Sequence, residues 1–299
     1  MHIIAEIGSN WRDGTDRESK KRAIELIDSA AQNGARIVKF QLFLADRLYR
    51  DTNKISSLRD LELPVGWLKE LKTHAENQGV EFLVTPFYPE AVDKLELAEV
   101  KFYKIASTDI AYIPLLTRVA LTGKPVFLST IGGKIIDDAD MSFEEVDQAL
   151  EILRPETERD EWGSVSYNDV VLLHCVSNYP APTKELNLGR LIDLAAEFMP
   201  LETGFSSHSL NVPVTASVVA YGASYIEVHY DLDDSRGVES AHSYSPDMLQ
   251  QLVQVTKDFE DARECNCRQT FSDFQARKDA FRDPVDWLRP PLENINELQ

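Results

Sequence analysis

Short, almost continuously apolar runs alternate along the chain with longer stretches in which apolar residues recur every three or four positions. Runs such as 2–8 and 36–43 have the composition of strands that are buried on both faces of a parallel sheet. Stretches such as 17–33 and 246–263 would place their apolar residues on one face of a helix. The pattern therefore predicts a chain built from repeated strand–helix units.

Eight such units are predicted along the chain. We expect strands at 2–8, 36–43, 80–87, 100–107, 125–130, 169–177, 202–209 and 225–232. We expect the helices at 17–33, 67–78, 89–97, 113–122, 142–153, 188–198, 214–221 and 246–263. A capping box of Ser142 with Glu145 would open the fifth of these helices.

The repeat indicates the α/β class and favours a closed (β/α)8 TIM barrel. An open doubly wound sheet is the alternative, because periodicity does not detect closure. We expect a single barrel domain at 1–264 and a short C-terminal tail at 265–299. Two polar segments, 46–64 and 155–168, are expected to be irregular loops, and the first is long enough for a functional role.

The charge balance narrows the choice of partners. The chain has 31 Lys and Arg against 50 Asp and Glu, a net charge of −19. So acidic a protein is a poor ligand for nucleic acid or an anionic membrane. We find no apolar run of about 18 residues and no basic segment before the first apolar run, so we expect neither a membrane span nor a signal peptide. Three cysteines without metal or disulfide spacing fit a reduced, cytoplasmic protein that acts on small molecules.

Polar residues collect where the predicted strands end, which is the end of a barrel that carries its chemistry. Any one of them has an ordinary structural explanation, such as a lysine extending to solvent or a hydrogen-bonded core histidine. Seven strands contribute to the same end, and this makes a shared site the better interpretation. The residues are Asn10, Asp13, Lys39, Gln41, Lys104, Ser107, Ser129, Asn178, Tyr179, Ser206, His208, Glu227 and His229.

Two kinds of ligand site are suggested by these residues. His208 and His229 end adjacent strands and could share a divalent metal with open coordination positions. Strand side chains alternate, so Glu227 faces the same way as His229. Lys39 and Lys104, with Lys124 before the fifth strand, would form a positive pocket for a phosphate or a carboxylate.

Seven segments, in this order and spacing, resemble the N-acetylneuraminate (sialic acid) synthase family. They are IAEIGSN at 4–10, VKFQ at 38–41, KIAS at 104–107, GKPVFLST at 123–130, LLHCVSNYPAP at 172–182, GFSSHS at 204–209 and EVHY at 227–230. The resemblance covers the barrel and implies a transferase of carbohydrate biosynthesis. Such an enzyme condenses phosphoenolpyruvate with an N-acetylmannosamine-type aldose, giving a 2-keto-3-deoxy sugar acid (a nonulosonate) and phosphate.

The resemblance also implies residue roles. It assigns a divalent metal, most simply Mn²⁺, to His208 and His229, and it makes Lys39 and Lys124 the lysines of the reaction. The residues that it places on phosphoenolpyruvate beside those lysines are Ser107, Ser129, Asn178 and Ser206. Asp13 or Glu239 would orient sugar hydroxyls. Asn10, Gln41, Lys104, Tyr179 and Glu227 complete the expected substrate site.

The chain departs from the family pattern at several points. The family's Ser-Asp-His is Ser206-Ser207-His208 here, and its Gly-Pro-Asp-His matches Gly237-Val238-Glu239-Ser240, which loses the histidine. The resemblance stops before the family's C-terminal antifreeze-like domain, which places an arginine on the sugar's N-acetyl group, so we do not expect that domain here. We therefore expect weak N-acetyl selectivity, unless a homodimer supplies a tail arginine or a separate antifreeze-like domain protein binds. The tail arginines are Arg277, Arg282 and Arg289.

Two other functions stay open from the sequence. A lysine at a barrel strand end can form an imine with a keto acid when burial lowers its pKa, so a Schiff-base aldolase using Lys104 is one alternative. A non-catalytic binding homologue is the other, suggested by the carboxylate lost at Ser207.

Overall fold

The computed structural model describes residues 1–48, 52–131, 143–153, 170–232 and 235–263. The chain divides into Met1–Glu260 and Asp261–Gln299, and the fold described below lies in the first of these units. Three predictions fall outside the described residues: the capping box with Ser142, the loop at 155–168 and the tail at 265–299.

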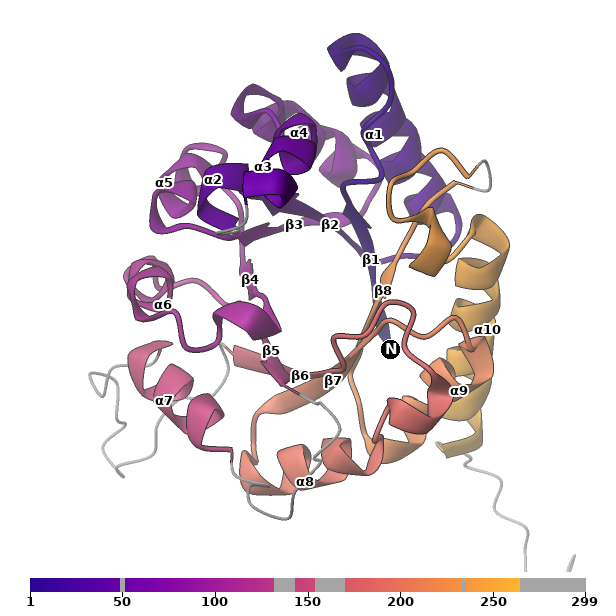
Figure 1. Ribbon diagram of the computed structural model, residues 1–299. Coiled ribbons are helices and arrows are strands. Elements are labelled where there is room, and N and C mark those ends of the chain that lie inside the picture. The colour runs from indigo at the N-terminus through magenta and orange to yellow at the C-terminus, as the bar shows by residue number, and fades with distance from the viewer. Residues whose placement is uncertain (49–51, 132–142, 154–169, 233–234, 264–299) are drawn as a thin grey trace, which may run out of the picture. The chain divides into compact units, whose positions relative to one another are not determined.

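Eight parallel strands close into a barrel in chain order, β1 to β8, with helices around the outside (Figure 1). The strands are β1 His2–Gly8, β2 Ile37–Leu42, β3 Glu81–Pro86, β4 Tyr103–Ile105, β5 Val126–Ile131, β6 Val170–Cys175, β7 Glu202–Ser207 and β8 Tyr225–His229. β1 pairs with both β2 and β8, so no strand is left at an edge. The TIM barrel prediction is confirmed, and the open sheet is excluded.

The helices follow the predicted order. They are α1 Asp16–Gln32, α4 Leu68–Asn77, α5 Pro89–Leu97, α6 Ile113–Ala120, α7 Glu144–Leu153, α8 Gly189–Glu197, α9 Val212–Ala216 and α10 Pro246–Arg263. α1 opens with a capping box in which Thr15 and Glu18 satisfy each other's backbone N–H groups. The predicted helix at 214–221 is instead the short α9 followed by a 3-10 turn, Ser217–Tyr221.

The segment 46–64 is not irregular, which corrects the prediction. It contains part of α2 Ala45–Leu48, α3 Thr52–Leu58 and a 3-10 turn at Arg59–Leu61. Helices this short span fewer than two full turns, so their apolar period is too brief to be recognised in the sequence. The predicted strand at 100–107 is also shorter, because the chain leaves β4 and enters a 3-10 turn at Ser107–Asp109.

The barrel interior has an apolar floor. Buried side chains from five strands form a hydrophobic cluster of their own: Ile4, Ile37, Leu83, Phe127 and Leu173. Three aromatic contacts tie the floor together, with Phe127 meeting Phe102 and Tyr225 edge to face and His2 stacking on Tyr225. A larger cluster fills the layer between the strands and the surrounding helices.

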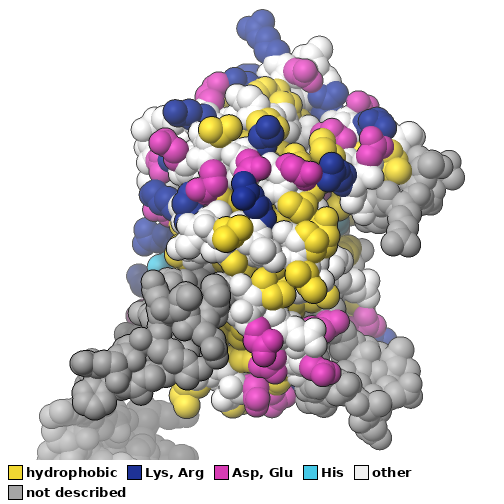
Figure 2. Space-filling model, turned by 90° about the vertical axis from the view of Figure 1, so that its left-hand side faces the viewer, with side chains coloured by type: hydrophobic (Ala, Val, Ile, Leu, Met, Phe, Trp, Pro, Cys, Tyr) yellow, Lys and Arg dark blue, Asp and Glu magenta, His cyan; other side chains and the backbone are white. Residues whose placement is uncertain are grey.

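The outer surface carries both signs of charge. Figure 2 shows one face on which acidic and basic side chains lie among apolar ones. Ion pairs such as Arg118–Asp93 and Lys101–Glu81 join neighbouring elements of the barrel wall. Among the described residues, no helix combines the length and the apolar character needed to cross a bilayer.

Candidate active site

A cavity of about 790 Å³ opens at the carboxyl ends of the strands. Every strand contributes a side chain to its wall, so the site is built by the barrel as a whole rather than by one loop. These eight side chains are Glu6, Lys39, Thr85, Lys104, Ser129, Cys175, Ser206 and Glu227. Loops after the strands add further walls, among them Ser107, Tyr179, Glu239 and His242.

Lys39 sits between two buried carboxylates at the base of the cavity. Its Nζ lies 3.0 Å from Glu227 Oε1 and 3.4 Å from Glu6 Oε2. The adjacent strands put these groups together, because Glu6 of β1 is in register with Lys39 of β2. Gln41 donates a hydrogen bond to Glu6 Oε1 at 2.6 Å, and Ser206 donates one to Glu227 Oε1 at 2.9 Å.

Burial and neighbouring charges give the carboxyl groups of Glu6 and Glu227 different pKa values. Burial raises the pKa of Glu6 above its ordinary value, and the positive charges of Lys39 and His229 only partly offset it. Burial acts in the same direction on Glu227, but Lys104 and Lys39 outweigh it and hold the pKa of Glu227 at about 2. Glu227 is therefore the ionised member of the pair, and Glu6 takes up a proton more readily. Such a separation is typical of catalytic carboxyl pairs.

Lys104 is a second buried amine in the cavity wall. Its Nζ donates to Ser129 Oγ at 2.6 Å and to the carbonyl of Ile105 at 3.0 Å. Burial is the main influence on it and lowers the pKa of Lys104 to about 8, although Glu227 pulls the other way. Lys39 differs, because Glu227 and Glu6 overcome its burial and raise its pKa. Lys39 is thus a permanent cation near neutral pH, while Lys104 titrates close to it.

The two predicted metal histidines lie side by side, with ring centroids 5.3 Å apart. His208 Nδ1 donates to the carbonyl of Val176 at 2.7 Å, and His229 Nδ1 is 2.9 Å from Glu239 Oε2. A ring whose Nδ1 is used in this way leaves Nε2 for a metal, and a carboxylate behind a ligating histidine is a recurrent feature of metal sites. The donor set therefore fits a divalent metal.

The surroundings of His208 keep its ring neutral, which is the form that binds a metal. Burial and the neighbouring His229 lower the pKa of His208 to about 3, which keeps it neutral. Burial also acts to lower the pKa of His229, but the hydrogen bond and charge of Glu239 raise it overall. The same contact lowers the pKa of Glu239 despite its burial. Glu239 is thus an ionised partner for His229.

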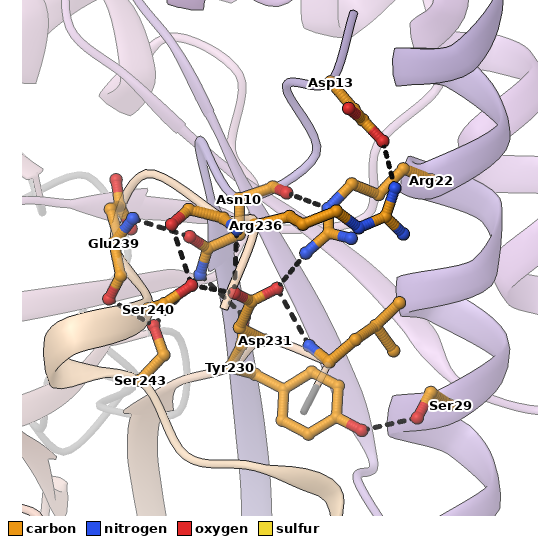
Figure 3. Close-up of polar contacts among 12 residues, drawn as sticks. Asn10, Asp13, Arg22, Ser29, Tyr230, Asp231, Arg236, Glu239, Ser240 and Ser243 are labelled. Atoms are coloured by element: carbon orange, nitrogen blue, oxygen red, sulfur yellow. Dashed lines mark hydrogen bonds and ion pairs between the residues drawn. The ribbon is translucent and has the colours of Figure 1, made fainter. Parts of the chain in front are cut away.

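A polar network fixes the loop that carries Glu239 (Figure 3). The Asp231 carboxylate accepts hydrogen bonds from Arg22 Nη2 at 2.5 Å and from the backbone N–H of Gly237 at 3.2 Å. Asn10 Oδ1 accepts the N–H of Glu239 at 2.8 Å, and Asn10 Nδ2 donates to the carbonyl of Tyr230. The Arg22 and Asp231 side chains are only 1% and 3% exposed, so this ion pair joins α1 to the end of the barrel from inside the protein.

Gly8 makes room for Glu239. Gly8 has a φ of +54°, and a Cβ there would lie 2.2 Å from Glu239 Oε2. A side chain at this position would therefore strain the backbone and displace the carboxylate.

Lys124 does not belong to the cavity, which corrects the prediction. It precedes β5 and so lies at the amino end of the barrel, the opposite end from the cavity. Its Nζ pairs with Glu96 Oε1 at 2.6 Å and the carbonyl of Val100 at 2.7 Å. The expected pocket of three lysines is wrong for the same reason. Two lysines remain, beside carboxyls of Glu6, Glu227 and Glu239.

Three further predicted site residues lie outside the cavity lining. Asn10 is fully buried and supports the Glu239 loop. Asp13 forms an ion pair instead, with its Oδ2 atom 2.5 Å from Arg236 Nη1. The exposed Asn178 donates to Glu185 Oε2 at 2.9 Å. The other predicted side chains all line the cavity: Lys39, Gln41, Lys104, Ser107, Ser129, Tyr179, Ser206, His208, Glu227, His229 and Glu239.

The sequence did not single out some residues that the cavity contains. Glu6 carries a detectable signal, a charged residue inside an apolar strand. Asp109 lines the cavity from the turn after β4, where burial raises its pKa to about 6. His242 lies in the loop after β8, away from any strand, so strand periodicity could not place it.

Comparison with known proteins identifies a family for this chain. The sequence model of the NeuB family matches residues 26–267. The chain is 33% identical over 267 residues to the spore coat polysaccharide biosynthesis protein SpsE of Bacillus subtilis, covering 85% of this chain and 66% of that protein. It is 34% identical over 274 residues to the N,N'-diacetyllegionaminic acid synthase of Legionella pneumophila, covering 86% and 72%.

A solved structure supports the same relationship. The N-acetylneuraminic acid (sialic acid) synthetase of Leptospira borgpetersenii, in complex with citrate, aligns with a TM-score of 0.76 and 27% identity. The alignment covers 93% of this chain and 90% of that one.

Proposed function

Since this chain belongs to the NeuB family, we propose that it condenses phosphoenolpyruvate with an aldose of the N-acetylmannosamine type. The products would be a 2-keto-3-deoxy sugar acid and phosphate. Relatives named as synthases of sialic, legionaminic and pseudaminic acids support this class of reaction. The observation that carries the proposal is the cavity itself, whose lining brings together Lys39, Lys104 and the His208–His229 pair.

Lys39 and Lys104 are the groups that bind and neutralise the phosphoenolpyruvate anion. Both amines are buried, so their attraction for a phosphate or carboxylate is little screened by water. Lys104 takes the role that the family resemblance assigned to Lys124. Ser129 and Ser206, which already contact Lys104 and Glu227, supply hydroxyl groups beside the same anion.

The balanced reaction joins C3 of phosphoenolpyruvate to the aldehyde carbon of the open-chain sugar. Water adds to C2, and the tetrahedral intermediate expels phosphate. Glu6, whose pKa is raised, would give a proton to the oxygen that was the aldehyde. Glu227 stays ionised and holds Lys39 in place.

A divalent metal, most simply Mn²⁺, would be held by His208 and His229. When bound, a metal supplies Lewis-acid polarisation of a carbonyl oxygen. Val176 and Glu239 set the ring orientation of the two histidines through their Nδ1 atoms. His208 stays neutral and so keeps its lone pair available to a ligand.

Phosphate release from phosphoenolpyruvate tests the proposal directly. The full chain, supplied with Mn²⁺, would be incubated with phosphoenolpyruvate and a panel of 2-acetamido and 2-hydroxy aldoses. We expect phosphate only when an aldose is also present, with a sugar acid of matching mass. If phosphoenolpyruvate binds and no aldose gives phosphate, the protein is a binding homologue and the synthase proposal is overturned.

A Schiff-base aldolase is the second candidate, favoured by one observation. Lys104 is buried and its pKa is lowered to about 8, which gives a larger fraction of free amine than an ordinary lysine has. Borohydride reduction in the presence of pyruvate would trap the imine on Lys104. Trapping that persists after chelation of metals would support the aldolase, and intact unmodified Lys104 would exclude it.

A further inference from the structure

We propose that His242 is an additional protein ligand of the metal, acting with His208 and His229, while Glu239 holds the His229 ring through Nδ1. The proposal rests on the metal role of His208 and His229 in the proposed function. It adds a third imidazole to the two-histidine site that the family resemblance implies.

The first observation is the distance between donor atoms. One ligand atom each from His229, Glu239 and His242 lie within 4.8 Å of one another. Donors on one metal are separated by about 3 to 3.5 Å when each bond is about 2.1 Å. A side-chain movement of about 1 Å in the cavity wall would close the gap between 4.8 Å and that spacing for His229 and His242.

The second observation is the arrangement of the rings. The His229 ring lies between the other two, 5.3 Å from His208 and 4.8 Å from His242 by centroid. The Tyr179 ring packs near all three histidine rings. Its centroid lies 4.0, 5.9 and 5.2 Å from the ring centroids of His208, His229 and His242. The histidines thus form one cluster around an aromatic side chain at the cavity wall.

The third observation is that the loop is built to present His242. Ser240 donates to Asp231 and to the carbonyl of Gly237, so the residue that matches the family's histidine points into the loop anchor instead. Ser243 donates to the carbonyl of Glu239 at 2.8 Å. The short 3-10 turn Ser240–His242 between these anchors places His242, two residues further along, at the cavity.

The added ligand changes which metal the site prefers. Imidazole donors favour Co²⁺ and Zn²⁺ over Mn²⁺, which prefers oxygen ligands. A site with three imidazoles should therefore bind Co²⁺ and Zn²⁺ well above Mn²⁺. A site with only two imidazoles should discriminate less.

The test is a Co²⁺ titration of the metal-stripped full chain, followed by calorimetry and visible absorption. The variant His242→Phe keeps an aromatic ring against Tyr179 and removes both nitrogens. Its matched control is His2→Phe, which changes an exposed histidine at the amino end of β1. We expect His242→Phe to weaken Co²⁺ binding by at least about 100-fold and to alter the d–d bands, with a smaller loss for Mn²⁺. The control should match wild type.

A second measurement uses the wild-type protein and so does not depend on the folding of a variant. Diethylpyrocarbonate modification would be mapped by mass spectrometry with and without saturating Co²⁺. We expect Co²⁺ to protect His242 and to leave His2 reactive. Equal modification of His242 in both states, or wild-type affinity and spectrum in His242→Phe, overturns the proposal.

The outcome is separable from that of the proposed function. Turnover with unchanged metal binding in His242→Phe would reject the ligand role and leave the synthase intact. If His242→Phe loses Co²⁺ affinity and the wild-type protein releases no phosphate with any aldose, the ligand role stands and the synthase proposal is overturned.

Discussion

The two ends of the barrel interior are made from the same faces of the same strands, yet one end is apolar and the other is charged. Moving two residues along a strand crosses from one to the other. On the inward face of β2, Ile37 lies in the floor and Lys39, two residues on, lines the cavity. The same holds for Phe127 and Ser129 on β5 and for Tyr225 and Glu227 on β8. Alternating strand positions share a face, so on each of these strands one residue reaches the floor and the next residue on the same face reaches the cavity.

The difference assigns separate tasks to the two ends. The floor fills one end of the barrel interior with packed apolar side chains and so holds the strands together. The cavity above it can then bury Lys39 between Glu6 and Glu227, an arrangement that adds little stability but sets the pKa values of its members. Conversely, a lysine at the amino end, Lys124, makes an ordinary surface pair with Glu96.

Replacing Lys39 with Met should have the largest effect. The substitution removes a cation from the phosphoenolpyruvate site and leaves Glu6 and Glu227 without their shared partner. We expect turnover to fall by about 10³-fold and stability to fall by about 3–5 kcal/mol. Phosphate release and urea denaturation measure the two effects. Turnover near that of wild type would show that the charged end does not bind the substrate through Lys39.

Replacing Phe127 with Ala should lower the stability that the apolar floor provides. Phe127 is buried in the floor against Phe102 and Tyr225, so its loss leaves a void and should cost about 3 kcal/mol. Turnover per folded molecule should stay close to that of wild type, because the cavity walls are unchanged. Phe127→Leu, which keeps more volume, is the control and should cost less. A large fall in turnover with unchanged stability would contradict the separation of tasks.

Raising the pH should weaken phosphoenolpyruvate binding through Lys104. Its pKa of about 8 means that the amine loses its charge above that pH, so the dissociation constant should rise by up to about tenfold per pH unit. Binding measured by calorimetry from pH 7 to 9 tests this, and Lys104→Met should remove the dependence.

The same group gives a signed prediction for stability. The folded-state pKa of Lys104 lies below the ordinary value of 10.5. Between about pH 8 and 10.5 the unfolded chain therefore binds more protons than the folded one, and this contribution to stability should rise with pH. A wild-type contribution that falls across this range, relative to Lys104→Met, would show that Lys104 remains charged in the folded protein.

Replacing Lys124 with Met should have the smallest effect. The Lys124 and Glu96 side chains are 27% and 39% exposed, so their ion pair is partly screened by water and is worth less than about 1 kcal/mol. Activity should be unchanged, in contrast to Lys39→Met. A large loss of turnover would mean that the amino end takes part in the reaction after all.

The periodicity of the sequence was sufficient to predict the eight strand–helix units, because buried parallel strands and amphipathic helices differ in length and period. It also placed His208 and His229 together, since both close adjacent strands of one barrel. The periodicity did not predict the short elements. α3 and the 3-10 turn after β4 carry too few residues to show a period.

What the sequence by itself determined was the repeat, the polar strand ends and hence the position of a cavity. Only the tertiary structure decided that the sheet closes, that Lys124 pairs with Glu96, that Asn10 supports the Glu239 loop, and that His242 meets His229. Local patterns report which face of an element a residue occupies. They do not report contacts made across the barrel or by its loops, because such contacts depend on where distant parts of the chain come to lie.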